Sequence, residues 1–394
     1  MKLPLLLVVG LVAVYAEENA LLKEFSDGNI KFSADVYSEM KKTNSGNFLV
    51  CPLSVDVILA LVHAGAKGDT AKQLSKGLHL PESHEEVQNI FKELSPKLKG
   101  TEEYTLSSAN KVYVKNGFQI SDNFKTVAVN VFNSEIQNID FTKSVAAATE
   151  MNKWVEAQTH DKIKDLISKD DLDEDTRAVL INAMYFKGSW VKQFSEYGTR
   201  KRPFHVSKVN KVDVDMMEIT DYFNYYEDAN LKAKFLEMPY EGNDISMTFI
   251  LPDDVEGLGE LENNIPAVLA TPKYSKERVH VQIPKYKIES TIKFKPILEN
   301  LGVKDLFNDN ADLTGIGAHK EQLYVSKVIQ KAFIEVEEKG TTAAAATAAI
   351  VSKKKANFQF RGVKVFEFQA DHPFMFVLKH QSAGILFVGR LSTL

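Results

Sequence analysis

From Glu337 to Lys355 the sequence reads EEKGTTAAAATAAIVSKKK, and the interpretation of the whole chain starts from this stretch. Between Lys339 and Lys353 it has no charge, no aromatic ring and no proline, although 26% of the chain is charged. A run of alanines favours a helix, and small residues bounded by charges also suit an exposed linker. A third interpretation is a loop that can later become a strand inside a sheet. The stretch alone leaves all three open.

As a strand, the stretch would place alternate side chains on opposite faces of a sheet. One face would carry Thr341, Ala343, Ala345, Thr347, Ala349 and Val351. The other face would carry Thr342, Ala344, Ala346, Ala348 and Ile350. Neither set contains a charge or an aromatic ring, so neither face would prevent the strand from entering a packed sheet.

Length and composition limit the possible classes of protein. The 394 residues show no repeat and no long linker, so one large domain is expected. An apolar share of 44% is typical of a globular protein with a large core. The net charge of -5 argues against a nucleic-acid partner, because phosphate binding needs a basic excess. After the N-terminus, no segment is long and apolar enough to span a bilayer.

Residues 1–16 have the anatomy of a secretory signal peptide. Lys2 precedes an apolar run from Leu3 to Val14, and small residues occupy the positions that a signal peptidase prefers. The mature chain is therefore expected to begin near Glu17, to form one domain over 17–394, and to be secreted without a membrane attachment. The alternative is a short hydrophobic helix of the fold.

The chain has one cysteine, Cys51, so no internal disulfide can form and a large core must stabilise the exported protein. Within an apolar segment, Cys51 is expected to be a small buried hydrophobic residue. No Asn-x-Ser/Thr sequon is present, so N-glycosylation is not expected.

Hydrophobic periodicity predicts both helices and strands. Helices are expected at Glu18–Lys42, Pro52–Ala64, Thr142–Ile167 and Thr291–Asn300. Strands are expected at Tyr104–Tyr113, Ala178–Phe186, Tyr222–Tyr226, Ala233–Pro239, Ile245–Leu251, Val279–Ile288, Tyr324–Glu337, Phe374–Leu378 and Gly384–Val388. The continuous apolar run at Ala178–Phe186 is typical of a strand covered on both faces. Because helices are grouped and do not strictly alternate with strands, the fold class is α+β.

No catalytic motif is present: the sequence has no nucleophile elbow, Walker loop, dinucleotide fingerprint or zinc-protease motif. His79 and His84 are five residues apart, which suits no helical metal pair, and both are expected on the surface. Asp371 and His372 are adjacent, so in a strand they would point to opposite faces and could not act together. No enzymatic activity, no metal and no cofactor are therefore expected.

Several segments carry a family resemblance. FQADHPFMF at Phe368–Phe376 and GILFVGR at Gly384–Arg390 resemble the C-terminal signature of the serpins. The segment Glu338–Ala346 is similar to the hinge of the serpin reactive-centre loop. Further matches lie at Asn47–Ser54, Gly65–Thr70, Leu180–Trp190 and Leu306–Gly315. They span essentially the whole mature chain in the family's order.

The resemblance implies three β-sheets, about nine helices and an exposed reactive-centre loop at about residues 338–360. In the family, a protease cleaves this loop and is trapped as an acyl-enzyme while the loop inserts as a central strand. The resemblance thus implies a monomer that forms a covalent complex with a serine protease.

Matching positions assigns roles to individual residues. The hinge would be Glu338, Gly340, Thr341, Thr342, Ala343, Ala344, Ala345 and Ala346. The region where the sheet opens would contain Ser54, Asn182, Trp190, Lys285 and Gln330. Lys285 matches the salt-bridge partner of the hinge glutamate. The chain departs from the family at Cys51, where serine is usual, and at Gln330, where many members have histidine.

The spacing from Glu338 puts the scissile residue at Lys354, followed by Lys355, with Lys353 as an alternative. A lysine there suits the acidic specificity pocket of a trypsin-like protease. The simpler interpretation is that the three lysines are a solvated charge run. Two other functions remain open: a non-inhibitory serpin that acts as a carrier or chaperone, and a hydrolase. Carriers tend to have bulky, charged or proline residues in the hinge, and this chain does not.

Overall fold

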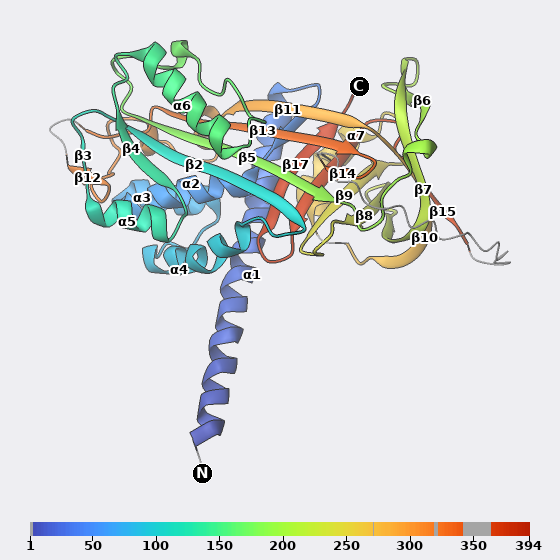
Figure 1. The fold of residues 1–394 in the computed structure, drawn as a ribbon, viewed down its shortest axis with the longest axis horizontal. Coiled ribbons are helices and arrows are strands. Elements are labelled where there is room, and N and C mark those ends of the chain that lie inside the picture. The colour runs from blue at the N-terminus through green and yellow to red at the C-terminus, as the bar shows by residue number, and fades with distance from the viewer. Residues whose placement is uncertain (1–2, 271, 319–321, 342–363) are drawn as a thin grey trace.

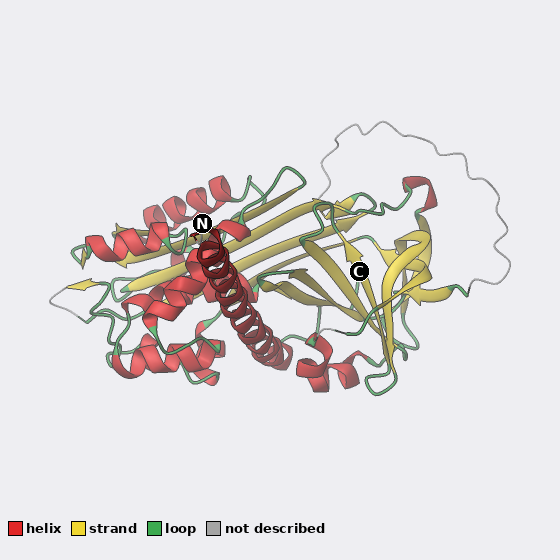
Figure 2. Ribbon diagram, turned by 90° about the horizontal axis from the view of Figure 1, so that it is seen from below, coloured by secondary structure: helices red, strands yellow, loops and turns green. Residues whose placement is uncertain are grey.

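The computed structural model describes residues 3–270, 272–318, 322–341 and 364–394, with the backbone alone for 3–19. Its helices are α1 (Leu3–Thr43), α2 (Pro52–Gly65), α3 (Gly68–Leu78), α4 (His84–Leu94), α5 (Asp122–Asn130), α6 (Ser144–Gln158), α7 (Leu258–Leu261), α8 (Ile265–Leu269) and α9 (Lys295–Asn300). Figure 2 shows most helices around one part of the molecule and mainly strands in the other part. Of the described helices, none is long and apolar enough to cross a membrane.

One sheet of the described chain has six strands. Their order is β11 (Tyr286–Lys293), β13 (Lys327–Glu337), β14 (Gly340–Thr341), β5 (Ala178–Ser189), β2 (Tyr104–Lys115) and β4 (Glu135–Ile139). The strand β5 is buried along nearly its whole length, as its continuous apolar run predicts.

The other large sheet has nine strands within the described residues. The order is β1 (Phe48–Val50), β17 (Gly384–Leu391), β16 (Phe374–His380), β9 (Ile245–Pro252), β8 (Ala233–Pro239), β7 (Lys211–Asp228), β10 (Ser275–Pro284) and β15 (Phe366–Gln369), with β6 (Arg200–His205) paired to β7. The long strand β7 pairs with β10 along Met216–Tyr225 and with β8 along Asn224–Asp228. Three sheets are expected, but the described strands form two large sheets, because β7 pairs with both β10 and β8 and so joins their strands into one sheet. A small sheet joins β3 (Gln119–Ile120) to β12 (Gly317–Ala318).

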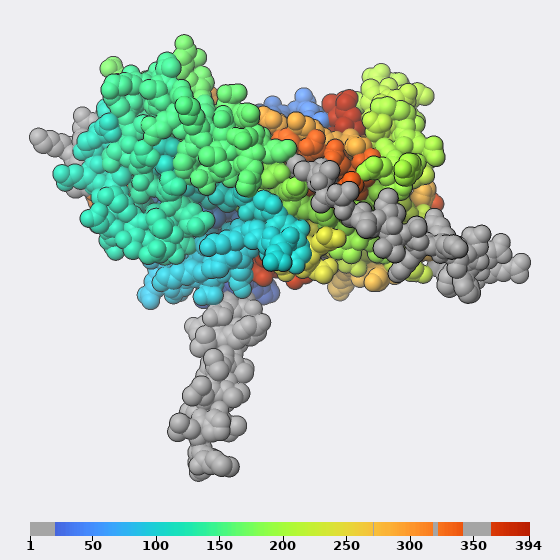
Figure 3. All heavy atoms as spheres, viewed as in Figure 1, coloured from blue at the N-terminus to red at the C-terminus, as the bar shows by residue number. Residues whose placement is uncertain are grey.

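The six-stranded sheet separates two hydrophobic cores. Leu180 and Met184 of β5 belong to the large core, whereas Val179 and Ile181 belong to a smaller core that contains Met151 of α6. This alternation follows from the period of two residues in a strand. The helix α6 therefore covers the outer face of β5 and β13, and in Figure 3 its green region forms the surface there.

Three expected elements differ from the structure. The helix expected at Thr291–Asn300 begins at Lys295, because Thr291–Lys293 belong to β11. The single strand expected at Val279–Ile288 is two strands of different sheets, β10 and β11, which are separated at Lys285. The helix expected to reach Ile167 ends at Gln158, because His160 and Asp161 adopt left-handed backbone conformations with φ of 52° and 59°.

The helix α1 begins at Leu3 and includes both the predicted signal segment and the helix expected at Glu18–Lys42. The signal peptide and its cleavage remain predictions. The α+β fold class is confirmed, because α2, α3 and α4 follow one another before the first long strand.

Candidate functional site

The short strand β14 lies between β5 and β13 at one end of the six-stranded sheet (Figure 1). Gly340 and Thr341 pair with Ser189 and Gly188 of β5 on one side, and with the end of β13 on the other. Farther along, β5 and β13 pair directly and in parallel over Val179–Tyr185 of β5. Two residues of the predicted hinge, Gly340 and Thr341, therefore already lie within the sheet.

Gly340 meets a steric requirement of this arrangement. Its φ is +155°, and a Cβ added there would lie 1.9 Å from the carbonyl oxygen of Gly188 and 2.8 Å from the Cα of Ser189. Both atoms belong to the backbone of β5, so no side chain can rotate away. Only a residue without a Cβ allows β14 to approach β5 this closely.

Thr341 is completely buried, and its hydroxyl lies 2.5 Å from the hydroxyl of Tyr240. The ring of Tyr240 stacks on Trp190 at a centroid distance of 4.1 Å. Burial raises the pKa of Tyr240 well above its usual value, so its hydroxyl stays neutral and available for this contact. The side chain of Thr341 thus points into the large core.

The three carbonyl groups before Gly340 are all bound by the segment that follows β5. The backbone N–H of Trp190 donates to Lys339 O at 2.9 Å, and its indole N–H donates to Glu337 O at 3.1 Å. The backbone N–H of Phe194 donates to Glu338 O at 2.9 Å. The turn that leads into β14 is therefore held by its backbone.

Charge also fixes this turn. Lys285 Nζ lies 2.9 Å from Glu338 Oε2 and 3.8 Å from a carboxylate oxygen of Glu337, and Thr199 donates to Glu338 Oε1 at 2.7 Å. Burial alone would raise the pKa of Glu338, but the hydrogen bonds from Lys285 and Thr199 lower it overall. Burial alone would lower the pKa of Lys285, but its bond to Glu338 and the nearby carboxylates raise it.

A buried polar cluster joins β5 and β13 beyond the end of β14. Gln330 donates to Asn182 Oδ1 at 2.6 Å and to Cys51 O at 2.7 Å, and it accepts from Cys51 N at 2.9 Å. Asn182 in turn donates to the carbonyl and hydroxyl oxygens of Ser54 and to Asn110. The cluster ties both strands to the start of α2. Cys51 is buried as predicted, and burial raises the pKa of its thiol.

The sequence-predicted residues thus fall into two groups near one seam of the sheet. Glu338, Gly340, Thr341, Trp190 and Lys285 come together around β14, whereas Ser54, Asn182 and Gln330 come together in the polar cluster. The remaining predicted residues lie outside the described chain; they are Thr342, Ala343, Ala344, Ala345, Ala346, Lys353, Lys354 and Lys355.

Sequence reasoning missed Tyr240, Thr199 and Asn110, because their roles depend on contacts between distant segments. The sequence pointed weakly to Gly188, because this residue lies in Leu180–Trp190, one of the segments that resemble the serpins.

Two expectations about histidine are wrong. Asp371 and His372 lie in the connection between β15 and β16, not in a strand, and His372 Nδ1 lies 2.8 Å from Asp371 Oδ1. The other ring nitrogen of His372 lies 2.8 Å from Pro252 O, so both nitrogens are occupied by structural contacts. His84, expected on the surface, is half-buried and packs against His63.

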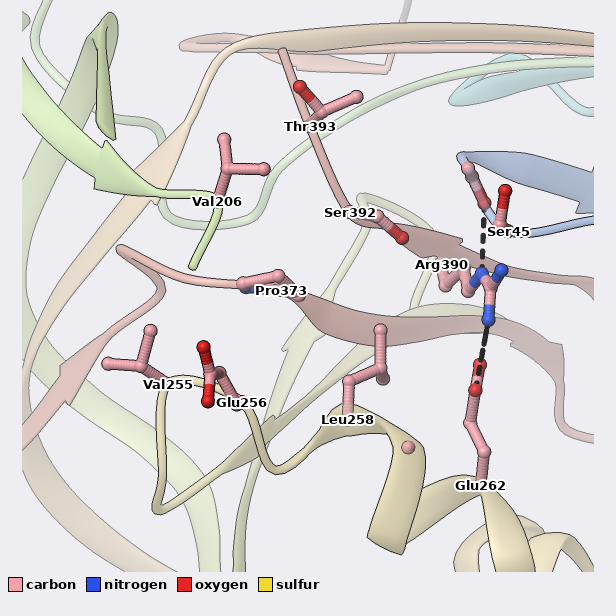
Figure 4. A pocket seen from close by; sticks show the side chains of 12 residues that line it. Ser45, Val206, Val255, Glu256, Leu258, Glu262, Pro373, Arg390, Ser392 and Thr393 are labelled. Carbon is pink, nitrogen blue, oxygen red and sulfur yellow. Dashed lines mark hydrogen bonds and ion pairs between the residues drawn. The ribbon is translucent and has the colours of Figure 1, made fainter. Parts of the chain in front are cut away.

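A surface pocket near the C-terminus is lined by apolar side chains such as Val206, Leu258 and Pro373 (Figure 4). Its cation, Arg390, is fully engaged: it donates to both carboxylate oxygens of Glu262 at 2.8 and 2.9 Å and to backbone carbonyl groups. Among the described residues that line the pocket, the one cation is therefore already paired, and the carboxylate of Glu256 also borders the pocket. In the described ranges, no group of three or more His, Cys, Asp or Glu residues could hold a metal ion.

The chain resembles known proteins over nearly its full length. A family model described as "Serpin (serine protease inhibitor)" matches residues 27–394. Alaserpin of Manduca sexta is 39% identical over 380 residues, which cover 94% of this chain and 95% of the relative. Antichymotrypsin-2 of Bombyx mori is 39% identical over 359 residues, which cover 90% and 94%.

A solved structure gives the same result. Serpin48 of Tenebrio molitor is 43% identical and superposes with a TM-score of 0.88, covering 94% of this chain and 98% of that one. The chain thus shares with these proteins both its sequence and the arrangement of sheets in which β14 lies. It belongs to the serpin family of serine protease inhibitors.

Proposed function

We propose that the chain is a secreted, monomeric inhibitor of trypsin-like serine proteases that acts once, by covalent trapping. After removal of residues 1–16, the single domain 17–394 would expose a bait loop at about 338–360. The protease would cleave after Lys354, before Lys355, and no cofactor would be needed. The observation that carries the proposal is β14, which already lies between the two strands that an inserting loop must separate.

The register of β14 supports insertion of the following residues. Gly340 pairs with Ser189 of β5 and with Glu337 of β13, and an antiparallel strand continues such pairing residue by residue. In this register, Thr347 would come level with both Asn182 and Gln330. Thr347 would point to the same side as Thr341, because they are six residues apart.

Insertion would therefore bring one hydroxyl to the buried polar cluster. It would break the bond between Gln330 and Asn182, and the hydroxyl of Thr347 would replace the lost partner. Among the core-facing residues after Thr341, Thr347 is the one with a polar side chain. This match between the loop and the seam favours an inhibitory serpin over a carrier or chaperone.

The choice of a trypsin-like target rests on the lysines at 353–355. A lysine at the scissile position fits an acidic specificity pocket. Family membership does not decide the target, since the name of one relative with 39% identity refers to chymotrypsin.

Incubation with trypsin tests the proposal. A complex that survives SDS is expected, and the mass of the released C-terminal peptide would distinguish cleavage after Lys353, Lys354 or Lys355. If only cleaved chain and fully active trypsin are recovered, the trapping mechanism is wrong. A melting temperature that does not rise after loop cleavage would then favour the carrier or chaperone.

A further inference from the structure

Two histidine side chains meet where α2 ends and α4 begins. The helix α2 contacts both α3 and α4 (Figure 1). His63, in the last turn of α2, is completely buried, and His84 is the first residue of α4. The centroids of their rings lie 4.6 Å apart, with 65° between the ring planes. The spacing of His79 and His84 could not reveal this pair, because its other member lies on another helix.

Ser75 of α3 fixes which nitrogen of His63 carries the proton. The Ser75 hydroxyl lies 2.9 Å from His63 Nε2, and it donates its one proton to Pro81 O at 3.0 Å. It can therefore only accept from His63, so Nε2 carries the proton and Nδ1 presents a lone pair. Histidines that bind metals are oriented in this way, by an acceptor for the N–H of the other ring nitrogen. Burial, and to a lesser extent His84, lowers the pKa of His63 to about 4, so its ring is neutral at neutral pH.

The two ring nitrogens that remain are both buried and unpaired. Neither His63 Nδ1 nor His84 Nε2 has a hydrogen-bond partner among the residues that the structure describes. Buried polar atoms without a partner are rare in folded proteins, and a bound ion is one of the causes. Neutral imidazole is a ligand that copper, nickel and zinc ions share. The two nitrogens therefore offer a pair of ligands to such an ion.

The spacing of the two rings favours a particular coordination geometry. A bond from histidine nitrogen to a metal ion is about 2.1 Å long, and the nitrogen lies about 1.2 Å from its ring centroid, so each centroid would be about 3.3 Å from the ion. With 4.6 Å between the centroids, the two bonds would meet at about 90°. Neighbouring ligands meet at this angle in square-planar copper(II) and nickel(II) sites, whereas zinc prefers the wider tetrahedral angle. Copper(II) also binds imidazole more tightly than nickel or zinc ions do.

We propose that His63 Nδ1 and His84 Nε2 bind one divalent transition-metal ion, copper(II) in preference to zinc, and that this ion joins the end of α2 to the start of α4. His84 is half-buried, so the ion would enter from the surface, where the exposed Glu85 and Glu86 of α4 attract cations. Water would complete the coordination, because the described residues offer no group of three or more metal-binding side chains. The ion would stabilise the native chain and would take no part in trapping a protease.

Titration of the full chain with copper(II) tests the site. Copper(II) should raise the melting temperature by about 3 °C at a free concentration of roughly 100 times its Kd, whereas Mg²⁺, which prefers oxygen ligands, should not. In His84→Phe an aromatic ring can still pack against His63 but offers no nitrogen, so the rise should disappear. Ser75→Ala removes the acceptor for the Nε2 proton and should weaken copper(II) binding about tenfold. The matched control is His160→Asn, which replaces an exposed histidine whose positive φ suits asparagine, and it should behave as the wild-type chain does.

Electron paramagnetic resonance of the chain with one equivalent of copper(II) identifies the ligands directly. The wild-type chain should show one more bound imidazole nitrogen than His84→Phe. If His84→Phe melts far below the wild-type chain without copper(II), His84→Gln replaces it in both measurements. Equal spectra and equal thermal shifts in the wild-type chain and the His84 variant would overturn the inference, because the ion would then lie elsewhere. An unchanged melting temperature of the wild-type chain in copper(II) would overturn it too. Neither measurement involves a protease, so the result is independent of whether the chain traps trypsin.

Discussion

Replacement of Gly340 by alanine should destabilise β14 between β5 and β13 and raise the fraction of molecules in which this strand is expelled. The new Cβ would lie 1.9 Å from Gly188 O, whereas such contacts essentially never fall below 3.0 Å, so the backbones must separate by at least 3.0 − 1.9 = 1.1 Å. Three contributions hold β14 in place: its pairing with β5, its pairing with β13, and the contact between Thr341 and Tyr240. At about 1 kcal/mol each, they amount to roughly 3 kcal/mol. Overpacking costs about 1–3 kcal/mol, which shifts the equilibrium toward the expelled strand about 5- to 140-fold.

Trp190 provides the assay, because its indole donates to Glu337 O and stacks on Tyr240. In a Trp154→Phe background it is the one remaining tryptophan, so its emission reports whether the turn is in place. Gly340→Ala should change this emission and should leave more trypsin active, because insertion would begin with a residue that does not fit. Gly259→Ala is the matched control, since nothing lies within 4 Å of a Cβ there. Unchanged emission in Gly340→Ala, together with unchanged amide exchange at the end of β5, would refute this reasoning.

Four further changes test the neighbouring contacts. Thr341→Arg should turn the inhibitor into a substrate, because a charge cannot enter the core without a partner; unchanged stoichiometry with trypsin would contradict the register. Gln330→Ala leaves buried polar partners unpaired and should lower the free energy of unfolding by about 2–5 kcal/mol, measured in urea. The pKa of Glu338 is lowered, so its bond to Lys285 contributes fully above the unfolded pKa of about 4.5 and is lost as the pH falls through the lower folded value. Trp190 emission should therefore change as the pH falls below 4.5, and Lys285→Met should abolish this step. Asp56 of α2 is buried, and burial raises the pKa of its carboxyl group above the unfolded value of about 3.8, so its contribution to stability is lost as the pH rises above that value. The gain of Asp56→Asn over the wild-type chain, in the free energy of unfolding measured by urea titration, should therefore grow with pH above about 4 by at most about 1.4 kcal/mol per pH unit.

Periodicity predicted those elements whose environment is uniform along their length. The strand β5 is an example, because a continuous apolar run is typical of a strand that is covered on both faces. Periodicity failed at Lys285, where one expected strand is two. The preferences of the residues near Lys285 could not reveal that the chain passes from one sheet to another at this point. The change depends on a hydrogen bond from Lys285 N to Asp215 O, and Asp215 lies far away in the sequence. The ion pair of Lys285 with Glu338 was predicted from the resemblance to the serpins, because no local sequence pattern relates these two residues.

The state of the hinge was beyond the sequence for a different reason. Small uncharged residues are compatible with a strand inside the sheet and with a loop outside it, so composition cannot distinguish the two. The decision depends on particular contacts: the hydroxyl of Tyr240 accommodates Thr341, and the backbone of Gly188 excludes any Cβ at position 340. The same contacts give the register of the stretch, and the register is what predicts that Thr347 would meet the polar cluster. A loop that had been fully outside the sheet would have left the face of every later residue undetermined.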